Sequence, residues 1–263
     1  MGSIVLSINV SIIIPTLNEA RYIEETLKSV ASQCPRSDFE VIVCDGGSKD
    51  STVEIARRYS RVVVCPIKDT GTQLDFAASV SRGNILIFLD ADTLLPESYL
   101  ERVVQSFRTD ETLWACGAPF GYDGRKRYKI RLGKVTLAVT DYVLVNLAMY
   151  LWYVFRDTFR FTEIPGCNFC IRRQIFFDVG GFKRFPSLPV DVALSSAVRE
   201  LTRQRGMGKM KIFKTMIVLT SPRHITLRRS ATIFKNYSKT LIKTRGKLSV
   251  HAQLVNVQQH PVK

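Results

Sequence analysis

The stretch Gly83-Asn-Ile-Leu-Ile-Phe-Leu-Asp-Ala-Asp92 decides the fold expected for this chain of 263 residues. Its apolar part, Ile85 to Leu89, predicts a short strand that is buried in a parallel sheet. Asp90 and Asp92 follow that strand directly. Two carboxylates at this spacing suit Mg²⁺ or Mn²⁺ bridging a diphosphate, because such a cation keeps positions open for phosphate oxygens. The alternative is a solvated loop in which Asp92 caps a helix that starts at Thr93.

The chain upstream repeats a pattern of strand, polar loop and helix, which predicts a doubly wound, mostly parallel α/β sheet. Ligands bind such sheets at the carboxyl ends of the strands. We therefore expect the loops Thr16–Glu19, Asp45–Asp50 and Asp90–Asp92 to meet in one crevice. The expected strands are Val10–Pro15, Phe39–Cys44, Val62–Cys65 and Ile85–Leu89, and the expected helices are Ala20–Gln33, Ser51–Tyr59 and Gln73–Ser81.

The second half of the chain has a different pattern, with strands, a basic stretch and one long apolar run. We expect a domain over residues 1–225, with a nucleotide-sugar half at about 8–110 and an acceptor half at 111–225, followed by a basic, helix-permissive tail at 226–263. The features are strands Trp114–Phe120, Gly166–Arg172 and Lys209–Thr220, a basic stretch Arg125–Lys134, an apolar run Val135–Phe155, a turn Gly180–Phe182 and a helix Val192–Arg203.

The loop Asp45-Gly-Gly-Ser-Lys-Asp50 offers a carboxylate at a strand end and glycines that let the backbone approach a ligand. An ordinary connection between a strand and a capped helix is the alternative interpretation. No Gly-x-Gly-x-x-Gly sequence follows any of the expected strands, which argues against a dinucleotide site of the Rossmann type.

Three motifs occur together in a specific order: SIIIPTLNE at 11–19, DGGSKDST at 45–52 and GNILIFLDADTLLP at 83–96. In order and spacing they resemble the family 2 glycosyltransferases, which have the GT-A fold and transfer sugars from nucleotide sugars with inversion. The resemblance continues through Gly166–Arg172, Gly180–Phe182 and Asp191, and covers about residues 8 to 225.

The resemblance implies roles for individual residues. Pro15, Thr16 and Glu19 match the lining of the nucleotide pocket, and Asp45 matches the carboxylate that reads the base, with Ser48 in the same motif. Asp90 and Asp92 match the DxD motif that holds Mn²⁺ or Mg²⁺, with Asp92 as the direct metal contact and Asp90 also near the nucleotide sugar.

Asp191 falls where the family has the second residue of a Glu-Asp pair that acts as general base. Here Val190 precedes it, so the pair is broken, but a single carboxylate in a closed crevice is sufficient for a base. The alternative is that Asp191 caps the following helix.

Several further residues have open roles. Arg172, Arg223 and His224 either neutralise the leaving diphosphate or are surface charges, and Gln73 and Asp75 stand near positions of donor contact. The QxxRW pattern of processive synthases is absent, which favours transfer of a single sugar to an acceptor hydroxyl or phosphate.

The chain has 38 Lys and Arg against 23 Asp and Glu, a formal charge of +15, which predicts a polyanionic neighbour. The apolar run Val135–Phe155 is long enough for about 30 Å of hydrocarbon. A single membrane span there would place Asp191 on the opposite side of the membrane from Asp45 and Asp92. If these residues share one active site, the run is instead a core helix, an interfacial helix or a re-entrant segment. We expect a peripheral protein on an anionic membrane surface, at the cytoplasmic face, with a lipid-linked or membrane-proximal acceptor.

Two other classes of function fit part of the pattern. A sugar-phosphate nucleotidyltransferase also uses a parallel sheet with acidic metal ligands, but its basic Gly-rich loop is missing here. A nucleic-acid-binding protein would explain the charge, whereas three acidic strand ends would repel phosphates without a metal, which argues against nucleic acid as partner. The six cysteines predict buried thiols in a reduced compartment, and the N-terminal stretch lacks the pattern of a signal peptide.

Overall fold

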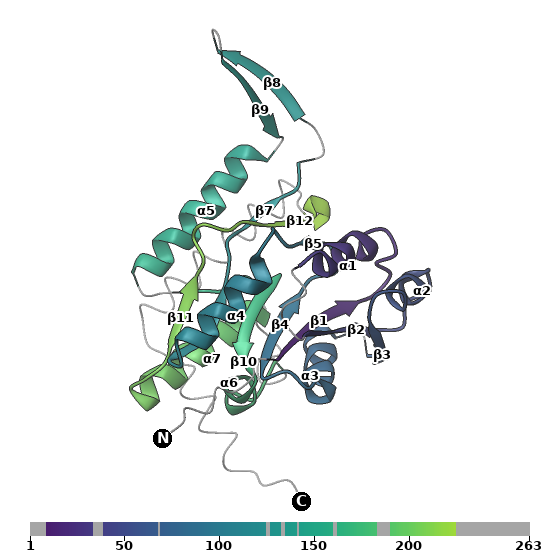
Figure 1. Ribbon diagram of the computed structural model, residues 1–263, viewed down its shortest axis with the longest axis vertical. Coiled ribbons are helices and arrows are strands. Elements are labelled where there is room, and N and C mark those ends of the chain that lie inside the picture. Colours follow the sequence, from purple (N-terminus) through teal and green to yellow (C-terminus); the bar gives the residue numbers. More distant parts are fainter. Residues whose placement is uncertain are drawn as a thin grey trace, which may run out of the picture. The chain divides into compact units, whose positions relative to one another are not determined.

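The computed structural model describes residues 9–33, 39–67, 69–124, 127–132, 135–140, 142–159, 162–182 and 190–224. The chain divides into two units, Met1–Ser221 and Pro222–Lys263. The described part of the second unit is a 3-10 helix, Pro222–His224. The predicted basic tail at 226–263 lies outside the described residues, and the elements below belong to the first unit (Figure 1).

A seven-stranded sheet forms the centre of the first unit, in the order β11-β6-β10-β4-β1-β2-β3 (Figure 1). All neighbours pair in parallel except β10, which runs antiparallel to both β4 and β6. The predicted mostly parallel α/β sheet is confirmed. Its strands are β1 (Val10–Thr16), β2 (Phe39–Asp45), β3 (Arg61–Val64), β4 (Ile85–Leu89), β6 (Leu113–Gly117), β10 (Asn168–Arg172) and β11 (Lys209–Ile212).

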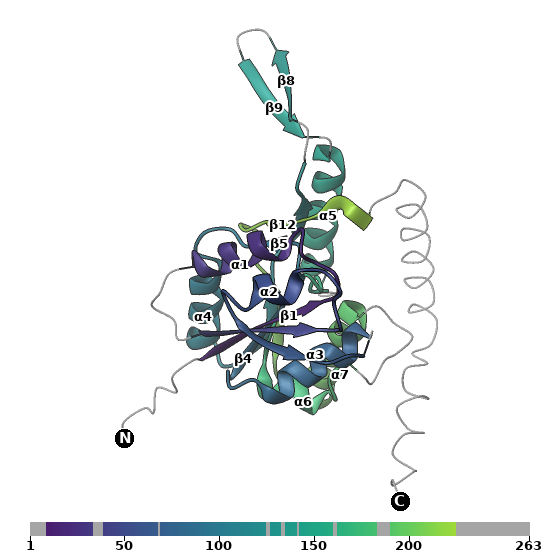
Figure 2. The ribbon, with the colours of Figure 1, turned by 90° about the vertical axis from the view of Figure 1, so that its right-hand side faces the viewer.

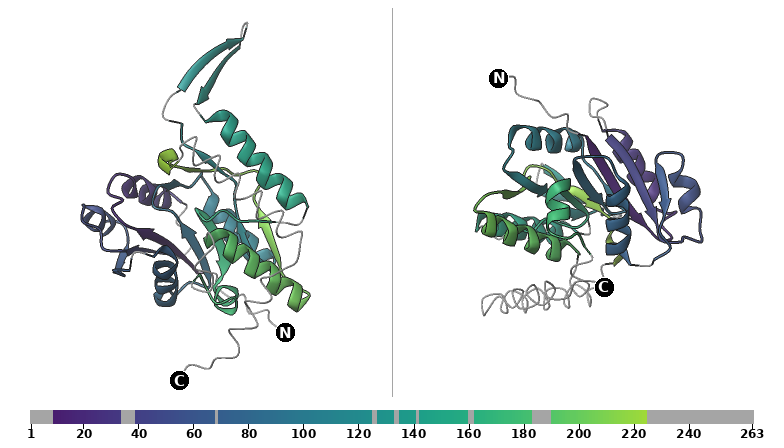
Figure 3. Two further views of the ribbon diagram at one scale, coloured as in Figure 1. Left: turned by 180° about the vertical axis from the view of Figure 1, so that it is seen from behind. Right: turned by 90° about the horizontal axis from the view of Figure 1, so that it is seen from below.

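Helices cover both faces of this sheet and create two cores (Figure 2). Successive strand residues point to opposite faces, so Ile87 packs in the first core and Phe88 in the second, which explains why β4 is apolar throughout. Seen from behind, α7 in green lies against the second face (Figure 3). The first core contains α1 (Ile23–Ala31), α2 (Thr52–Ala56) and α4 (Tyr99–Thr109), and the second contains α3 (Thr70–Val80), α6 (Arg173–Asp178) and α7 (Val190–Arg205).

A second sheet of three strands, β5-β12-β7, begins one residue after Asp92. Its strands are β5 (Thr93–Leu94), β7 (Phe120–Tyr122) and β12 (Val218–Thr220). This sheet corrects two predictions. The expected strand 209–220 is two strands in different sheets, separated by a turn in which the Met216 N–H donates to the Phe213 carbonyl at 3.1 Å. The expected strand 114–120 is also divided, into β6 and β7, at Ala118 and Pro119.

The apolar run 135–155 is also not one segment. Its β-branched first part is strand β9 (Val135–Thr140), which pairs antiparallel with β8 (Arg127–Leu132). Helix α5 (Val143–Thr158) begins after Asp141 and packs on β7 and β11. Among the helices that the structure describes, none is both long enough and apolar enough to cross a bilayer.

Candidate active site at the carboxyl edge of the sheet

The carboxyl ends of six strands share one edge of the large sheet, together with the amino end of β10. The register places Thr16 beside Asp45 on neighbouring strands. It also places Asn168 beside Leu89, and the Asp90 N–H donates to the Cys167 carbonyl at 3.4 Å. The loops after β1, β2 and β4 therefore meet the segment that enters β10.

Asp45 is buried at the end of β2 and is fixed by four hydrogen bonds. Its Oδ1 accepts the hydroxyls of Thr16 at 3.1 Å and Ser48 at 2.5 Å, and its Oδ2 accepts the N–H groups of Gly47 at 2.9 Å and Ser48 at 2.8 Å. Gly47 has φ +94°, which favours glycine. The loop thus folds back onto its own carboxylate and holds it in one orientation.

Asn18 joins the loops after β1 and β2, a role that sequence reasoning missed. Its backbone is left-handed, with φ 58°, a conformation that Asn adopts more readily than most residues. The Asn18 N–H donates to Ser48 Oγ and the Lys49 N–H donates to Asn18 Oδ1, both at 2.8 Å. The Glu19 N–H donates to Thr52 Oγ1 at 2.8 Å. Pro15, Thr16 and Glu19 therefore lie on a segment tied to the Asp45 loop.

Gln73 supports this loop from α3. A Cβ on Gly46 would lie 2.2 Å from Gln73 Nε2, so the glycine is required by close packing. The same amide donates to the Ile67 carbonyl at 2.8 Å, and the side chain is buried. Gln73 therefore shapes the connection after β3 and the start of the Asp45 loop.

Asp90 and Asp92 lie just after β4. Asp90 is exposed, whereas Asp92 is only 9% exposed. Asp92 Oδ1 accepts the Thr220 hydroxyl at 3.3 Å, and its carbonyl accepts the Ser221 N–H at 3.2 Å. The alternative that Asp92 caps a helix is wrong, because β5 follows it and α4 begins at Tyr99.

Asp191 lies in the first turn of α7, one residue inside the helix rather than ahead of it. Gly166 packs against it: a Cβ there would lie 3.2 Å from the Asp191 Cβ. Burial raises the pKa of the Asp191 carboxyl, while backbone N–H groups, including those of Val192 and Gly166, oppose the rise by donating to it. A carboxylate with a raised pKa is a stronger base than an exposed one.

The charges of the DxD motif and of Asp191, about 100 residues later in the sequence, both act on the buried thiol of Cys167. Burial, followed by the charges of Asp90, Asp191 and Asp92, raises the pKa of Cys167 well above its usual value. Gly166, next to Cys167, packs against Asp191, and the Cys167 carbonyl accepts the Asp90 N–H, so the base candidate and the DxD motif both contact this short segment.

The carboxylates of Asp90 and Asp92 suit a cation that binds together with the diphosphate of the substrate. Within the described ranges, no cluster of three or more His, Cys, Asp and Glu side chains has the arrangement of a metal site. Mg²⁺ and similar cations commonly use one or two carboxylates and fill the remaining positions with phosphate oxygens and water. Asp90 and Asp92 match that arrangement.

Helix α7 binds the segment that leads to Cys167 at every second residue. The Ile164 N–H donates to Ser195 Oγ at 3.1 Å, and both residues are fully buried. A buried ion pair between Arg156 of α5 and Glu163 fixes the same segment from its other side. The three contacts with α7 are Arg199 to the Thr162 carbonyl, Ser195 to the Ile164 N–H, and Asp191 to the Gly166 N–H.

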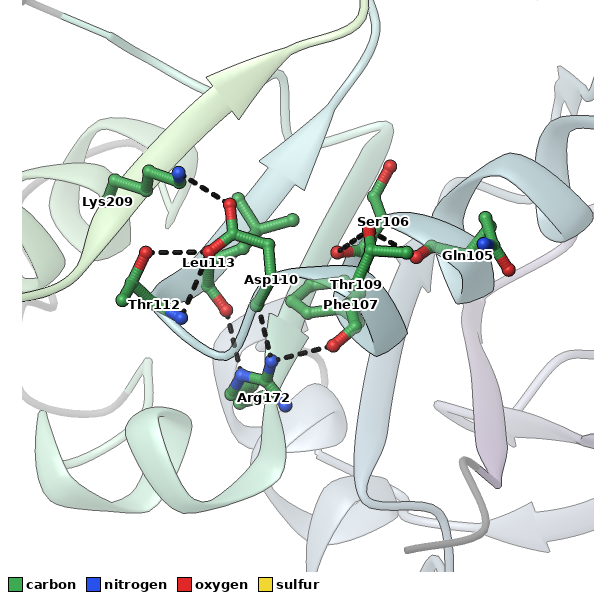
Figure 4. A network of polar contacts seen from close by, with 9 residues as sticks. All are labelled: Gln105, Ser106, Phe107, Thr109, Asp110, Thr112, Leu113, Arg172 and Lys209. Carbon is green, nitrogen blue, oxygen red and sulfur yellow. Dashed lines mark hydrogen bonds and ion pairs between the residues drawn. The ribbon is translucent and has the colours of Figure 1, made fainter. Parts of the chain in front are cut away.

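Arg172 lies at the opposite edge of the sheet, so its predicted contact with the diphosphate is wrong. It pairs with Ile85 at the amino end of β4 because β10 is antiparallel. Its guanidinium donates to three carbonyls, from Nε to Leu113 at 2.8 Å and from Nη2 to Phe107 and Asp110 at 2.9 Å (Figure 4). Arg172 thus joins α4, β6 and β10.

The remaining candidates have separate locations. Asp75 on α3 accepts the Phe182 N–H at 2.8 Å, and Gly181 next to it has φ +66°. Asp75 therefore anchors the predicted Gly180–Phe182 turn. Arg223 and His224 lie in the 3-10 helix of the second unit, and their contact with a diphosphate stays a prediction.

The sequence matches the Glycosyl transferase family 2 over residues 11–183, about two thirds of the chain. The chain belongs to this family. Glycosyltransferase AglE of Haloferax volcanii is 42% identical over 106 residues, which cover 37% of this chain and 34% of AglE. The probable glycosyltransferase YdaM of Bacillus subtilis is 26% identical over 187 residues, 66% of this chain and 42% of YdaM. The chain thus spans less than half the length of either curated relative.

Solved structures of glycosyltransferases share the fold of this family member. The mannosyltransferase PcManGT of Pyrobaculum calidifontis, in complex with GDP-Man and Mn²⁺, has a TM-score of 0.53 at 20% identity, covering 81% of this chain and 56% of PcManGT. Glucosyl-3-phosphoglycerate synthase of Mycobacterium tuberculosis, with Mn²⁺ and UDP-glucose, has a TM-score of 0.58 at 17% identity, covering 90% and 78%. At these identities the likeness shows the GT-A fold alone.

Proposed function

We propose that this protein is an inverting, metal-dependent glycosyltransferase that moves one sugar from a nucleotide diphosphate sugar to an acceptor hydroxyl or phosphate. The observation that carries the proposal is that the segment Gly166–Cys167 contacts both candidates at the carboxyl edge of the sheet: Gly166 packs against Asp191, and the Cys167 carbonyl accepts the Asp90 N–H. Family membership and the Mn²⁺ and nucleotide sugars named for PcManGT and the mycobacterial synthase support it.

The nucleotide would bind beside the Asp45 loop. A carboxylate has about four lone-pair sites, and the chain itself supplies four donors to Asp45. The Thr16 hydroxyl has a second acceptor, the Cys44 carbonyl at 3.5 Å. Rotation of that hydroxyl would free Asp45 Oδ1 to accept an N–H of the base, with the loop unchanged.

Asp90 and Asp92 would hold the cation, with Asp92 oriented by the Thr220 hydroxyl. When bound, Mn²⁺ or Mg²⁺ would neutralise charge that develops on the leaving diphosphate. The chain's own contribution is to present two carboxylates at the end of a fully buried strand.

Asp191 would accept the proton of the acceptor at its carboxylate as the acceptor oxygen attacks the anomeric carbon. Burial raises its pKa, which increases its basicity, and the Gly166 N–H fixes its orientation. Asp191→Asn keeps the size and the hydrogen-bond acceptor but removes the basicity. Turnover should fall by about 10²–10⁴ with donor affinity nearly unchanged, and turnover near that of the wild type would leave Asp191 with only a structural role in the first turn of α7.

Donor binding can be tested through protein stability, because a ligand that binds only the folded state raises the melting temperature. We expect one of the UDP-, GDP- or TDP-sugars to stabilise the wild type in the presence of Mn²⁺, and Asp92→Ala to abolish that metal-dependent shift. Glu101→Ala removes an exposed carboxylate on α4 and is the matched control. A shift that persists in Asp92→Ala, or no shift with any donor, would refute the proposed site.

The acceptor would be lipid-linked or membrane-proximal, and the enzyme would work as a peripheral protein on an anionic membrane surface. The formal charge of +15 supports this part of the proposal, because anionic lipids attract basic surfaces. Transfer to a water-soluble acceptor at the same rate with and without vesicles would count against it.

A further inference from the structure

Helix α5 exposes a ridge of large apolar side chains along its whole length. Its other side packs inward: Tyr153 is buried, and the Asn146 amide bonds the backbone of Tyr122 on β7. Residues four apart are neighbours on a helix surface but differ by about 40° around the axis, and the exposed residues recur at that spacing, so they cross the outer half of α5 obliquely. The ridge is Val143 (43% exposed), Leu147 (53%), Leu151 (54%), Phe155 (57%) and, just after the helix, Phe159 (58%).

The ridge is continuous rather than a set of scattered residues. It extends over about 24 Å, given 16 residues at 1.5 Å each. The rings of Phe155 and Phe159 contact each other, with centroids 4.6 Å apart. An exposed apolar surface of this extent on a soluble domain marks a site of interaction.

The β8–β9 hairpin precedes this helix directly and separates apolar from basic positions. Its register pairs Ile130 with Leu137, and residues opposite each other in a ladder share a face. The segment 125–134 contains six Lys and Arg and no acidic residue. On one face fall positions Tyr128, Ile130, Leu132, Val135, Leu137 and Val139, and on the other Arg127, Lys129 and Arg131 opposite Thr140, Ala138 and Thr136.

We propose that the α5 ridge and the β8–β9 hairpin form a membrane-docking surface that lies in the interface of an anionic bilayer, with α5 parallel to the membrane. This inference rests on the proposed function, because it places the acceptor of the proposed sugar transfer at the bilayer. An amphipathic helix lies in the interface by burying its apolar face, and basic residues add attraction to anionic lipids.

Charge favours a bilayer over a second copy of the chain as the occupant. A two-fold dimer through α5 would place the same surface of both copies together. With the two helices parallel, the basic hairpin segments would approach each other, and like charges across an interface are unfavourable. An anionic lipid surface has the complementary charge.

The docking surface is connected to the metal site through the three-stranded sheet. β12 carries Thr220, which bonds Asp92, and it pairs with β7, on which α5 packs. Two residues of this region, Ile217 before β12 and Leu219 on it, are also apolar and exposed. A Cβ on Gly121 would contact both Asn146 of α5 and Ile217. A bilayer on this surface would present its acceptor beside the carboxylate edge.

Flotation of the full chain with vesicles of phosphatidylglycerol and phosphatidylcholine tests the proposal. We expect binding that high salt reduces but does not abolish, because salt screens the charges and not the apolar contacts. The ridge variant Leu147→Gln/Leu151→Gln/Phe155→Gln should lose binding by about tenfold or more. The control Phe76→Gln/Phe177→Gln/Met207→Gln changes three exposed apolar residues outside α5 and should bind like the wild type.

Circular dichroism would show that both triple variants are folded, and the metal-dependent melting shift with a nucleotide sugar separates the two proposals. A ridge variant that keeps the donor shift but loses the vesicles supports docking through α5. Absence of the donor shift in the wild type refutes the proposed function, whatever the vesicle result. Equal vesicle binding by the ridge variant and the wild type overturns the docking surface, as does a wild-type dimer that the ridge variant cannot form.

Discussion

A carboxylate that is removed from water holds its proton more tightly, and Asp191 is such a group. The environment of Asp191 differs from that of Asp45, which is buried and receives four donors from its own loop and from Thr16. The two side chains have the same chemistry and different surroundings. Asp45 is arranged to present a fixed acceptor, and Asp191 is arranged to take up a proton.

The raised pKa of Asp191 predicts a pH-dependent difference in stability. Below the ordinary value of 3.8 the carboxyl is protonated in both states, and as pH rises the unfolded chain ionises first. The free energy of unfolding contributed by Asp191 therefore falls until the folded-state pKa is passed. The Asp191→Asn variant has no carboxyl to ionise at this position, so its free energy of unfolding should rise relative to that of the wild type as the pH increases from acid to neutral. Urea unfolding of the metal-free proteins across that range measures the difference, and a constant difference would contradict the assigned burial effect.

At the scale of elements, local pattern was sufficient for the strands and helices around the donor side. β4 is apolar throughout and both neighbouring loops are polar, so the strand and its carboxyl end could be predicted from a single window. β12 could not be predicted in this way, because its partners β5 and β7 lie about 100 residues or more away in the sequence. The same holds for Arg172, whose location depends on the direction of β10.

The pairing of α7 with the segment 162–166 was also hidden from the sequence. Ser195 resembles any other helical serine until the fold brings Ile164 to it, and no local signal marks the contact. The general position of Asp191 could be predicted because a family motif carries it. The groups that bind Asp191 could not be predicted from the sequence, because they belong to a segment about 25 residues earlier in the chain.

Ser195→Ala should weaken catalysis through the position of Asp191. Loss of the hydroxyl leaves the buried Ile164 N–H without this acceptor and loosens the segment that carries Gly166. We expect kcat to fall by about tenfold with an unchanged KM for the donor, since small errors in orientation are costly. Steady-state kinetics and the acid limb of the pH profile would show the effect. Thr202→Ala, whose hydroxyl bonds the Arg199 carbonyl within α7, is the control; a rise in donor KM with constant kcat would exclude a positioning role.

At the scale of the molecule, β10 joins two parts of the large sheet in the first unit, because it pairs with β4 on one side and with β6 on the other. The amino end of β10 reaches the active-site edge, and its carboxyl end is fixed by Arg172 on the far edge (Figure 4). One short strand therefore connects the chemistry at one edge with a purely structural cluster at the other.

Arg172→Met should destabilise the protein without changing its chemistry. The substitution keeps an unbranched apolar stem but removes the donors to three carbonyls, at a cost of about 2–4 kcal/mol in unfolding free energy. The donor-dependent melting shift should remain, because the residue lies at the opposite edge from Asp90. Chemical denaturation and donor titration measure the two effects separately, and loss of donor binding in a folded variant would restore Arg172 as a diphosphate contact.

The contacts at 162, 164 and 166 require that two residues of this segment advance about as far as four residues of α7. The segment has no regular secondary structure; two residues of chain near full extension advance about 6.6 Å, and four residues of helix advance about 6.0 Å. The mismatch accumulates by only about 1.2 Å over the two steps from Arg199 through Ser195 to Asp191, which hydrogen bonds can absorb, whereas a much longer pairing would lose register. Adding or removing one residue between 162 and 166 would turn the alternate positions away from α7 and leave Asp191 without Gly166. The spacing of this segment is thus as much a part of the proposed catalytic geometry as the carboxylate of Asp191 itself.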